Sequence, residues 1–179
     1  MPRLFSAIEI PCSVAERLTL HRFGLSGARW VDPENYHLTL RFIGDVDEPT
    51  ARDFTSALGM IEATPFELRL DALGSFGGGK PRAIFASFAP SEGLEVLRRA
   101  NERAAREAGL PPEGRNFKPH VTLARLKGAR ADAVAAYLER QGGGLTAEPF
   151  IVSRFVLYSS RNSVGGGPYV IEAAYPLED

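Results

Sequence analysis

The chain contains one short phrase twice, Asn35-Tyr36-His37-Leu38-Thr39-Leu40-Arg41 and Lys118-Pro119-His120-Val121-Thr122-Leu123-Ala124-Arg125. Both copies alternate polar and apolar residues, which is typical of a β-strand with one buried face. In each half of the chain, the predicted strand comes before a predicted helix and a pair of strands. This weak internal repeat predicts a pseudo-twofold molecule in which the two strands meet across one cleft.

In the first copy, alternation predicts that His37, Thr39 and Arg41 line one face of the strand. The intervening residues, and Phe42 after them, then point into the core. In an extended strand His37 and Thr39 are neighbours on the same face. The first motif therefore offers an imidazole, a hydroxyl and a guanidinium to a common surface.

In the second copy, His120 and Thr122 share a face, but Arg125 breaks the parity. A regular strand would turn Arg125 to the opposite side, so we expect it to reach the site from the end of the strand or to act elsewhere. The second motif thus repeats the imidazole and the hydroxyl, but alternation does not place its arginine on their face.

Such a pair of faces is suited to acid–base chemistry on a phosphodiester. Two imidazoles with ordinary pKa values near 6.5 can be held with one neutral and one protonated near neutral pH. The neutral ring can take a proton from water, and the protonated ring can give one to a departing oxygen. The threonine hydroxyls and an arginine can hold the phosphoryl oxygens. One such motif would indicate only an amphipathic strand, but two copies that use two of three histidines favour a catalytic site.

Hydrophobic periodicity and turn residues predict an α+β fold with antiparallel or mixed sheets. We expect residues 1–179 to form one domain. Predicted strands cover residues 3–10, 28–31, 36–43, 66–73, 82–89, 119–126, 149–158 and 169–175, and predicted helices cover 13–23, 49–63, 91–109 and 131–140. We expect Ser13 and Ser91 to cap two of these helices. Glycines at 165–167 indicate a loop between the last two strands.

Composition limits the classes of protein. The chain is 44% hydrophobic and 24% charged with a formal net charge of −1, which is typical of a globular protein and argues against coating long stretches of nucleic acid. A single cysteine, Cys12, fits a reducing compartment. We see no signal peptide and no apolar run near the roughly 20 residues of a membrane helix. We therefore expect a cytoplasmic monomer without membrane contact.

Other signals are weaker. The stretch Gly74-Ser75-Phe76-Gly77-Gly78-Gly79-Lys80 nearly matches a P-loop, but Pro81 follows where a hydroxyl is needed and a strand follows where a helix is needed. We interpret it as a hairpin tip from which Lys80 could reach an RNA strand. His21 has no partner motif and is interpreted as structural. The scattered histidines predict no metal site and no cofactor.

Residues around the motifs could contact the rest of a nucleic acid. Basic residues that flank the second motif could steer a polyanion, and aromatic residues could stack on a terminal base. Phe42 is expected in the core, and for the other aromatic candidates stacking and packing both remain possible. The basic candidates are Arg115, Lys118, Arg125 and Lys127; the aromatic candidates are Trp30, Phe42, Phe117 and Tyr158.

The chain resembles the 2H phosphoesterases along nearly its whole length, and within them the RNA 2′,3′-cyclic phosphodiesterases, also called LigT-like or 2′-5′ RNA ligase family proteins. The paired His-x-Thr-x motifs carry the resemblance to the superfamily. The flanking segments narrow it to this branch: Arg29-Trp30-Val31, Glu34-Asn35, Pro81-Arg82, Phe117-Lys118-Pro119 and Leu157-Tyr158-Ser159-Ser160-Arg161. The family fold implies two similar α+β lobes around a central cleft, each contributing one motif.

By this resemblance, His37 is the proton donor and His120 the proton acceptor, although spacing alone does not assign the roles. Thr39, Thr122 and Arg125 match phosphate-binding positions. The implied reaction is metal-independent opening of a 2′,3′-cyclic phosphate at an RNA 3′ end to a 2′-phosphomonoester. Three alternatives remain at this point: 2′-5′ RNA ligase activity, hydrolysis of a small cyclic nucleotide, and a non-catalytic module that binds RNA ends.

Overall fold

The protein is described by a computed structural model that covers residues 3–141, 145, 147–160 and 168–179. The predicted loop at Gly165–Gly167 lies outside these residues. The helices are α1 (Cys12–Thr19), α2 (Glu48–Gly59), α3 (Glu92–Glu107) and α4 (Ala131–Arg140), with a short 3-10 helix η1 (Pro33–Asn35). The strands are β1 (Arg3–Glu9), β2 (Ala28–Trp30), β3 (His37–Asp45), β4 (Phe66–Leu68), β5 (Leu70–Phe76), β6 (Ala83–Phe88), β7 (His120–Leu126), β8 (Phe150–Val152), β9 (Arg154–Ser160) and β10 (Tyr169–Pro176).

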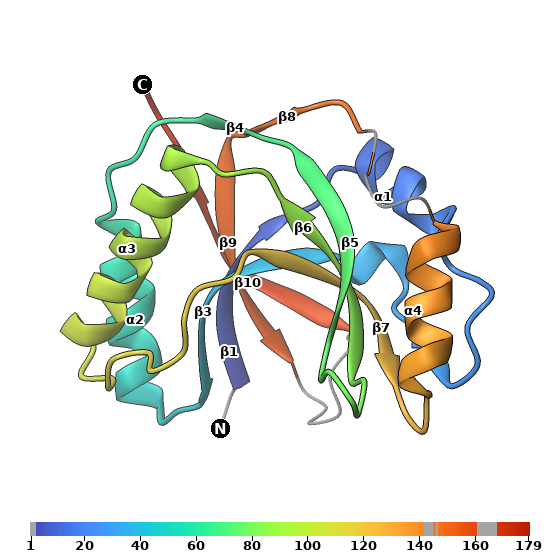
Figure 1. The fold of residues 1–179 in the computed structure, drawn as a ribbon. Coiled ribbons are helices and arrows are strands. Elements are labelled where there is room, and N and C mark those ends of the chain that lie inside the picture. The colour runs from blue at the N-terminus through green and yellow to red at the C-terminus, as the bar shows by residue number, and fades with distance from the viewer. Residues whose placement is uncertain (1–2, 142–144, 146, 161–167) are drawn as a thin grey trace.

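Two four-stranded sheets form the centre of the molecule (Figure 1). Their strand orders are β10-β9-β1-β3 and β2-β7-β6-β5, and β4 pairs with β8 in a separate ribbon. Every pairing between described strands is antiparallel. Helices α2 and α3 lie on one side of the molecule, and α1 and α4 lie on the other. The prediction of an α+β fold with antiparallel sheets is confirmed.

The two halves of the chain exchange strands. β9 and β10, from the end of the chain, complete the sheet of β1 and β3, whereas β2, β5 and β6 join β7 in the other sheet. The motif strands β3 and β7 therefore lie in different sheets, and they contact each other. The division of residues 1–179 into one domain of two similar lobes stays a prediction.

The apolar faces of both motif strands enter one hydrophobic core. Leu38 and Leu40 of β3, and Val121 and Leu123 of β7, are at most 5% exposed and belong to the same cluster of buried residues. Because one face of each strand packs into the core, the face with the motif histidine is directed away from it. The core thereby orients the catalytic candidates.

Helix starts were predicted with mixed success. Ser91 caps α3 as predicted, because its Oγ accepts a hydrogen bond from the backbone N–H of Leu94 at 3.2 Å. The prediction for Ser13 is wrong: α1 begins one residue earlier, after Pro11, without a side-chain cap, and ends at Thr19 rather than near Phe23. The fixed φ of proline turns the chain into the helix without help from a side chain.

The near-P-loop is the tip of the β5–β6 hairpin, as predicted. Gly77 has a φ of +106°, and a Cβ there would lie 2.3 Å from the carbonyl oxygen of Lys80. This tight turn therefore requires glycine. Strand β6 follows the turn, so no helix N-terminus is directed at the glycines.

Candidate active site

A β-bulge in β7 aligns its three functional residues. Alternate residues of β6 pair with His120, Thr122 and Arg125, and the pairing skips Leu123. The skipped residue is a bulge, which shifts the side-chain alternation by one position. Arg125 therefore returns to the face of His120 and Thr122. We expected Arg125 to reach the site from the end of the strand or to act elsewhere; the bulge instead places it on the histidine face.

Strand β3 carries a bulge at the matching position. Alternate residues of β1 pair with His37, Thr39 and Phe42, and the pairing skips Leu40. The bulge brings Phe42 to the face of His37, where its side chain is 37% exposed, and turns Arg41 to the opposite face. Two predictions are therefore wrong: Phe42 is not a core residue, and Arg41 does not share a face with His37.

Arg41 is a buried structural residue, only 8% exposed. Its Nε donates to a carboxylate oxygen of Glu102 at 2.7 Å, and its terminal nitrogens donate to the backbone carbonyls of Phe42 and Pro111. These bonds connect β3 to α3 and to the segment that follows α3. With its donors committed there, Arg41 is not available to a phosphate on the histidine face.

Both motif histidines are held by the same hydrogen bond. The Nδ1 atom of His37 lies 2.9 Å from the carbonyl oxygen of Asn35, and the Nδ1 atom of His120 lies 2.7 Å from that of Lys118. A carbonyl oxygen only accepts, so Nδ1 carries the hydrogen in both rings. In the neutral state each Nε2 then has a free lone pair, and in the protonated state it carries a proton. Each ring is therefore fixed in the tautomer that presents Nε2 for proton transfer.

Aromatic rings surround His37. The ring centroids of Phe5 and Tyr169 lie 5.0 and 5.1 Å from that of His37, and Tyr158 lies at 6.0 Å. Phe5 pairs with Phe42 across β1 and β3, so it lies on the same face as the motif. This apolar environment removes water from the imidazole. The sequence analysis missed Phe5 and Tyr169, although an aromatic residue on the polar face of a predicted strand could have indicated Phe5.

His120 has a similar aromatic environment from the hairpin. Phe76 and Phe85 lie 4.9 and 5.7 Å from its ring and stack on each other at 4.2 Å. Gly74 makes this possible, because a Cβ at this position would lie 2.6 Å from the Phe85 ring. The sequence analysis missed both phenylalanines. The near match of the hairpin tip to a P-loop depends on its glycines and does not indicate the phenylalanines.

These surroundings lower both histidine pKa values. Burial lowers the pKa of His37 to about 4, and the nearby charges of His120 and Arg125 act in the same direction. Burial also lowers the pKa of His120, with a contribution from the charge of Lys118. The lowered pKa values favour the neutral form of both rings near neutral pH in the protein by itself. The negative charge of a bound phosphate would raise both pKa values again.

The predicted basic cluster divides into different roles. The Nζ atom of Lys118 lies 5.3 and 5.2 Å from the ring centroids of Phe76 and Phe85, so it stacks on the rings that contact His120. Arg115 pairs with Glu113 at 3.5 Å. Arg125 and Lys127 are exposed and take part in none of the ion pairs between described residues. Arg125 alone of the four has a side chain placed on the histidine face by strand register.

Of the remaining stacking candidates, only Tyr158 lies beside a motif histidine. It pairs with Phe5 across β1 and β9 and so faces the site. Trp30 is turned to the core face and lies 6.0 Å from the buried ring of Tyr137. Phe117 lies under the guanidinium of Arg98, at 5.1 Å. Arg161, part of the family resemblance, lies outside the described residues.

His21 is structural in this fold, because its Nδ1 lies 2.6 Å from the side-chain oxygen of Gln141 and so connects the end of α1 to the end of α4. Among the described residues, no three or more His, Cys, Asp or Glu side chains gather in a way that could hold a metal ion. None of the described helices combines the length and the apolar composition needed to cross a membrane.

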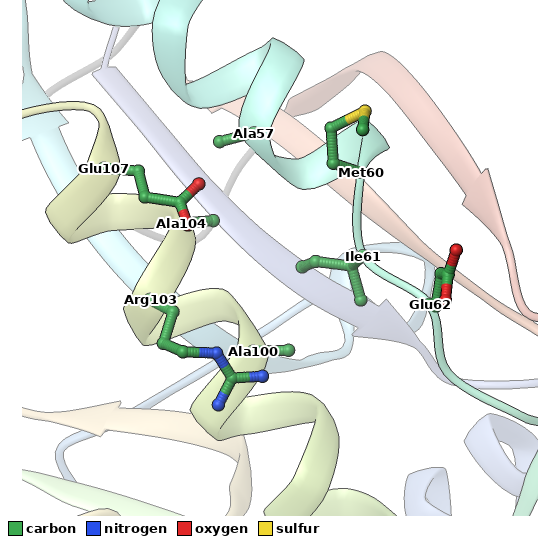
Figure 2. Close-up of a pocket in the computed structure, with 8 residues that line it drawn as sticks. All are labelled: Ala57, Met60, Ile61, Glu62, Ala100, Arg103, Ala104 and Glu107. Atoms are coloured by element: carbon green, nitrogen blue, oxygen red, sulfur yellow. The ribbon is translucent and has the colours of Figure 1, made fainter.

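Residues at the end of α2 and on α3 line a surface pocket (Figure 2). The helices contribute small alanines and the charged Arg103 and Glu107, and the end of α2 contributes an exposed methionine. No motif residue lines this pocket. Its lining residues are Ala57, Met60, Ile61, Glu62, Ala100, Arg103, Ala104 and Glu107.

Known proteins share this sequence and this arrangement. A protein of Aeropyrum pernix named RNA 2′,3′-cyclic phosphodiesterase is 38% identical over 132 residues, which cover 73% of this chain and 75% of that protein. The protein of the same name from Escherichia coli is 32% identical and covers 69% of this chain and 71% of its own. Crystal structures of E. coli LigT with 3′-AMP and with phosphate superpose with TM-scores of 0.82 and 0.79 at 26% and 27% identity, over at least 99% of both chains. The sequence model of the 2′-5′ RNA ligase superfamily matches residues 11–163, and the chain belongs to this family.

Proposed function

We propose that the protein hydrolyses the 2′,3′-cyclic phosphodiester at an RNA 3′ end to a 2′-phosphomonoester. The observation that supports this most strongly is the matched pair of histidines. Each has its Nδ1 hydrogen committed to a backbone carbonyl and shares a strand face with a threonine. Two imidazoles with presented Nε2 atoms are the groups that an acid–base reaction at phosphorus requires.

The reaction consists of two proton transfers. The neutral Nε2 of His120 takes a proton from water as the water oxygen bonds to phosphorus. The bond from phosphorus to the ribose O3′ breaks, and the protonated Nε2 of His37 donates its proton to O3′. The product is a 2′-phosphomonoester, and the two rings exchange protonation states. Because the rings supply both transfers, the step needs no metal ion and no cofactor.

We assign His37 as the donor and His120 as the acceptor. The resemblance to the family carries this assignment, and the lowered pKa of His37 means that the ring must gain its proton in the substrate complex before it can act as the acid. The proton is acquired once the anionic phosphate lies beside the ring and raises its pKa. Substrate binding therefore favours the protonated form of His37, which is the form that can act as the acid.

Thr39, Thr122 and Arg125 hold the phosphoryl group in this proposal. Each threonine shares a strand face with its histidine, so its hydroxyl can donate to a non-bridging oxygen. The charge of Arg125 reaches His37 of the other sheet, since it contributes to the lowered pKa there. An arginine so placed stabilises the negative charge that develops on the phosphoryl oxygens.

The partner in this proposal is an RNA fragment with a 2′,3′-cyclic phosphate end, such as a tRNA fragment, or a smaller nucleotide with the same end. The names of the relatives and the 3′-AMP complex of E. coli LigT support this class of ligand. We propose further that the protein acts as a monomer in the cytoplasm.

The test uses an oligonucleotide with a 2′,3′-cyclic phosphate end, incubated with and without EDTA. We expect a 2′-phosphomonoester in both samples, identified by resistance to an enzyme specific for 3′-phosphates. A 3′-phosphomonoester would contradict protonation of O3′, and loss of activity that a divalent ion restores would contradict the two-histidine mechanism.

Ligation is the second candidate, and the family match to the 2′-5′ RNA ligase superfamily favours it. A 5′-hydroxyl of another RNA can occupy the position of the attacking water in the same geometry. Adding an oligonucleotide with a 5′-hydroxyl to the assay measures the share of product that is joined through a 2′-5′ bond.

A further inference from the structure

Arg29 lies directly opposite Arg125 in the β2–β7 pairing. Residues that face each other in an antiparallel pair extend to the same side of the sheet. Register with β6 places Arg125 on the face of His120 and Thr122, so Arg29 shares this face as well. The site therefore contains a second arginine that the analysis of the motifs did not identify.

The pairing of these two arginines is unfavourable by itself. Like charges directly opposite each other on a sheet repel. Both side chains are exposed, and neither forms a hydrogen bond or ion pair with any other described residue. An anion between Arg29 and Arg125 would remove the repulsion.

The location of the pair relates it to the reacting phosphate. Thr122 and Arg125 are separated by two effective strand positions because of the bulge, or about 7 Å along the strand. Arg29 is one strand farther from β6, on the edge strand β2. A phosphate held by Arg29 is therefore about one nucleotide away from a phosphate held by Thr122. Ala83, on the other side of Arg125, adds no bulk to this face.

We propose that Arg29, together with Arg125, binds a second phosphate of the substrate, namely the one attached to the 5′ oxygen of the terminal nucleoside. This inference rests on the proposed function and deepens it. The site would distinguish RNA ends, which carry this phosphate, from nucleoside 2′,3′-cyclic phosphates, which do not. Charged hydrogen bonds from an arginine to this phosphate correspond to a preference of roughly tenfold or more.

The test compares kcat/KM for two dinucleotides that end in a 2′,3′-cyclic phosphate. One has a natural phosphodiester between its nucleosides, and the other has an uncharged methylphosphonate at that position. We expect the natural dinucleotide to be preferred at least about tenfold. In Arg29→Gln this ratio should fall severalfold, mainly through an increase in KM for the natural dinucleotide, while Arg125 keeps the rest of the preference. A third substrate is the mononucleotide cytidine 2′,3′-cyclic phosphate with a 5′-phosphate. Its kcat/KM reports whether a terminal phosphate can replace the phosphodiester.

The matched control is Arg52→Gln, which removes an exposed arginine on α2, a helix that contacts α3 and β10. It should keep the wild-type ratio between the two dinucleotides. A ratio near one in the wild-type protein, or an unchanged ratio in Arg29→Gln, would overturn the subsite. If neither dinucleotide is hydrolysed, the proposed function itself fails, so the two failures are distinguishable.

Discussion

Replacing Arg41 with methionine separates a structural arginine from a catalytic one. Arg41 is 8% exposed and ion-paired with Glu102, which is 15% exposed. Removing one partner of a buried ion pair costs about 3–5 kcal/mol. Glu102 keeps two other partners, the Nε of Arg106 at 3.3 Å and the backbone N–H of Glu113 at 3.1 Å. We therefore expect Arg41→Met to lower the free energy of unfolding by the smaller of these amounts, about 3 kcal/mol.

Urea unfolding with an unchanged m-value measures this loss. Adding Glu102→Gln to Arg41→Met should cost less than the sum of the two single changes by about 1–3 kcal/mol, because the second change removes the carboxylate left without its main partner. At a temperature well below unfolding, kcat/KM on a cyclic-phosphate end should remain within a few-fold of wild type.

Arg125→Met is the matched comparison, since Arg125 is exposed on the histidine face. It should change the free energy of unfolding by less than about 0.5 kcal/mol, while kcat/KM falls at least about tenfold. The reasoning from the β3 bulge would be refuted if Arg41→Met kept full stability and lost activity as Arg125→Met does. That result would place Arg41 at the phosphate.

Three further predictions concern the histidines. His37→Ala and His120→Ala should each lower kcat by about 10²–10⁴-fold, and the double variant should be little worse than either. The control His21→Ala should leave kcat unchanged. Near-normal kcat in either motif variant would remove that residue from the site. On a nitrophenyl phosphodiester, whose leaving group needs little protonation, His37→Ala should recover much of its loss in the chemical step and His120→Ala should not; the reverse would exchange the acid and base roles. The pKa of His37 falls from 6.5 to about 4 on folding, so between these pH values the unfolded chain binds more protons and stability decreases as pH falls, by up to about 3 kcal/mol. In urea unfolding, the free energy of unfolding of His37→Asn should therefore decrease less between pH 7 and pH 4 than that of the wild-type protein. Parallel plots of this free energy against pH for the two proteins would contradict the prediction.

The sequence alone determined the features that depend on local patterns. Alternation identified the motif strands and placed each histidine beside its threonine, since residues two apart on a strand share a face. Turn and capping residues identified the hairpin tip and the start of α3. The repeat of His37-x-Thr39 in His120-x-Thr122 predicted a pseudo-twofold molecule in which two strands far apart in the chain meet across one cleft.

Only the tertiary structure decided which arginine serves the site. In sequence, Arg41 is in phase with its motif and Arg125 is out of phase, but the bulges at Leu40 and Leu123 reverse both assignments. A bulge is a mismatch between the residue counts of two paired strands, so it becomes visible only when the partner strand is known. The same reason applies to the aromatic rings around the histidines and to the pairing of Arg29 with Arg125. These contacts join segments that no local pattern relates, and strand pairing alone brings them together.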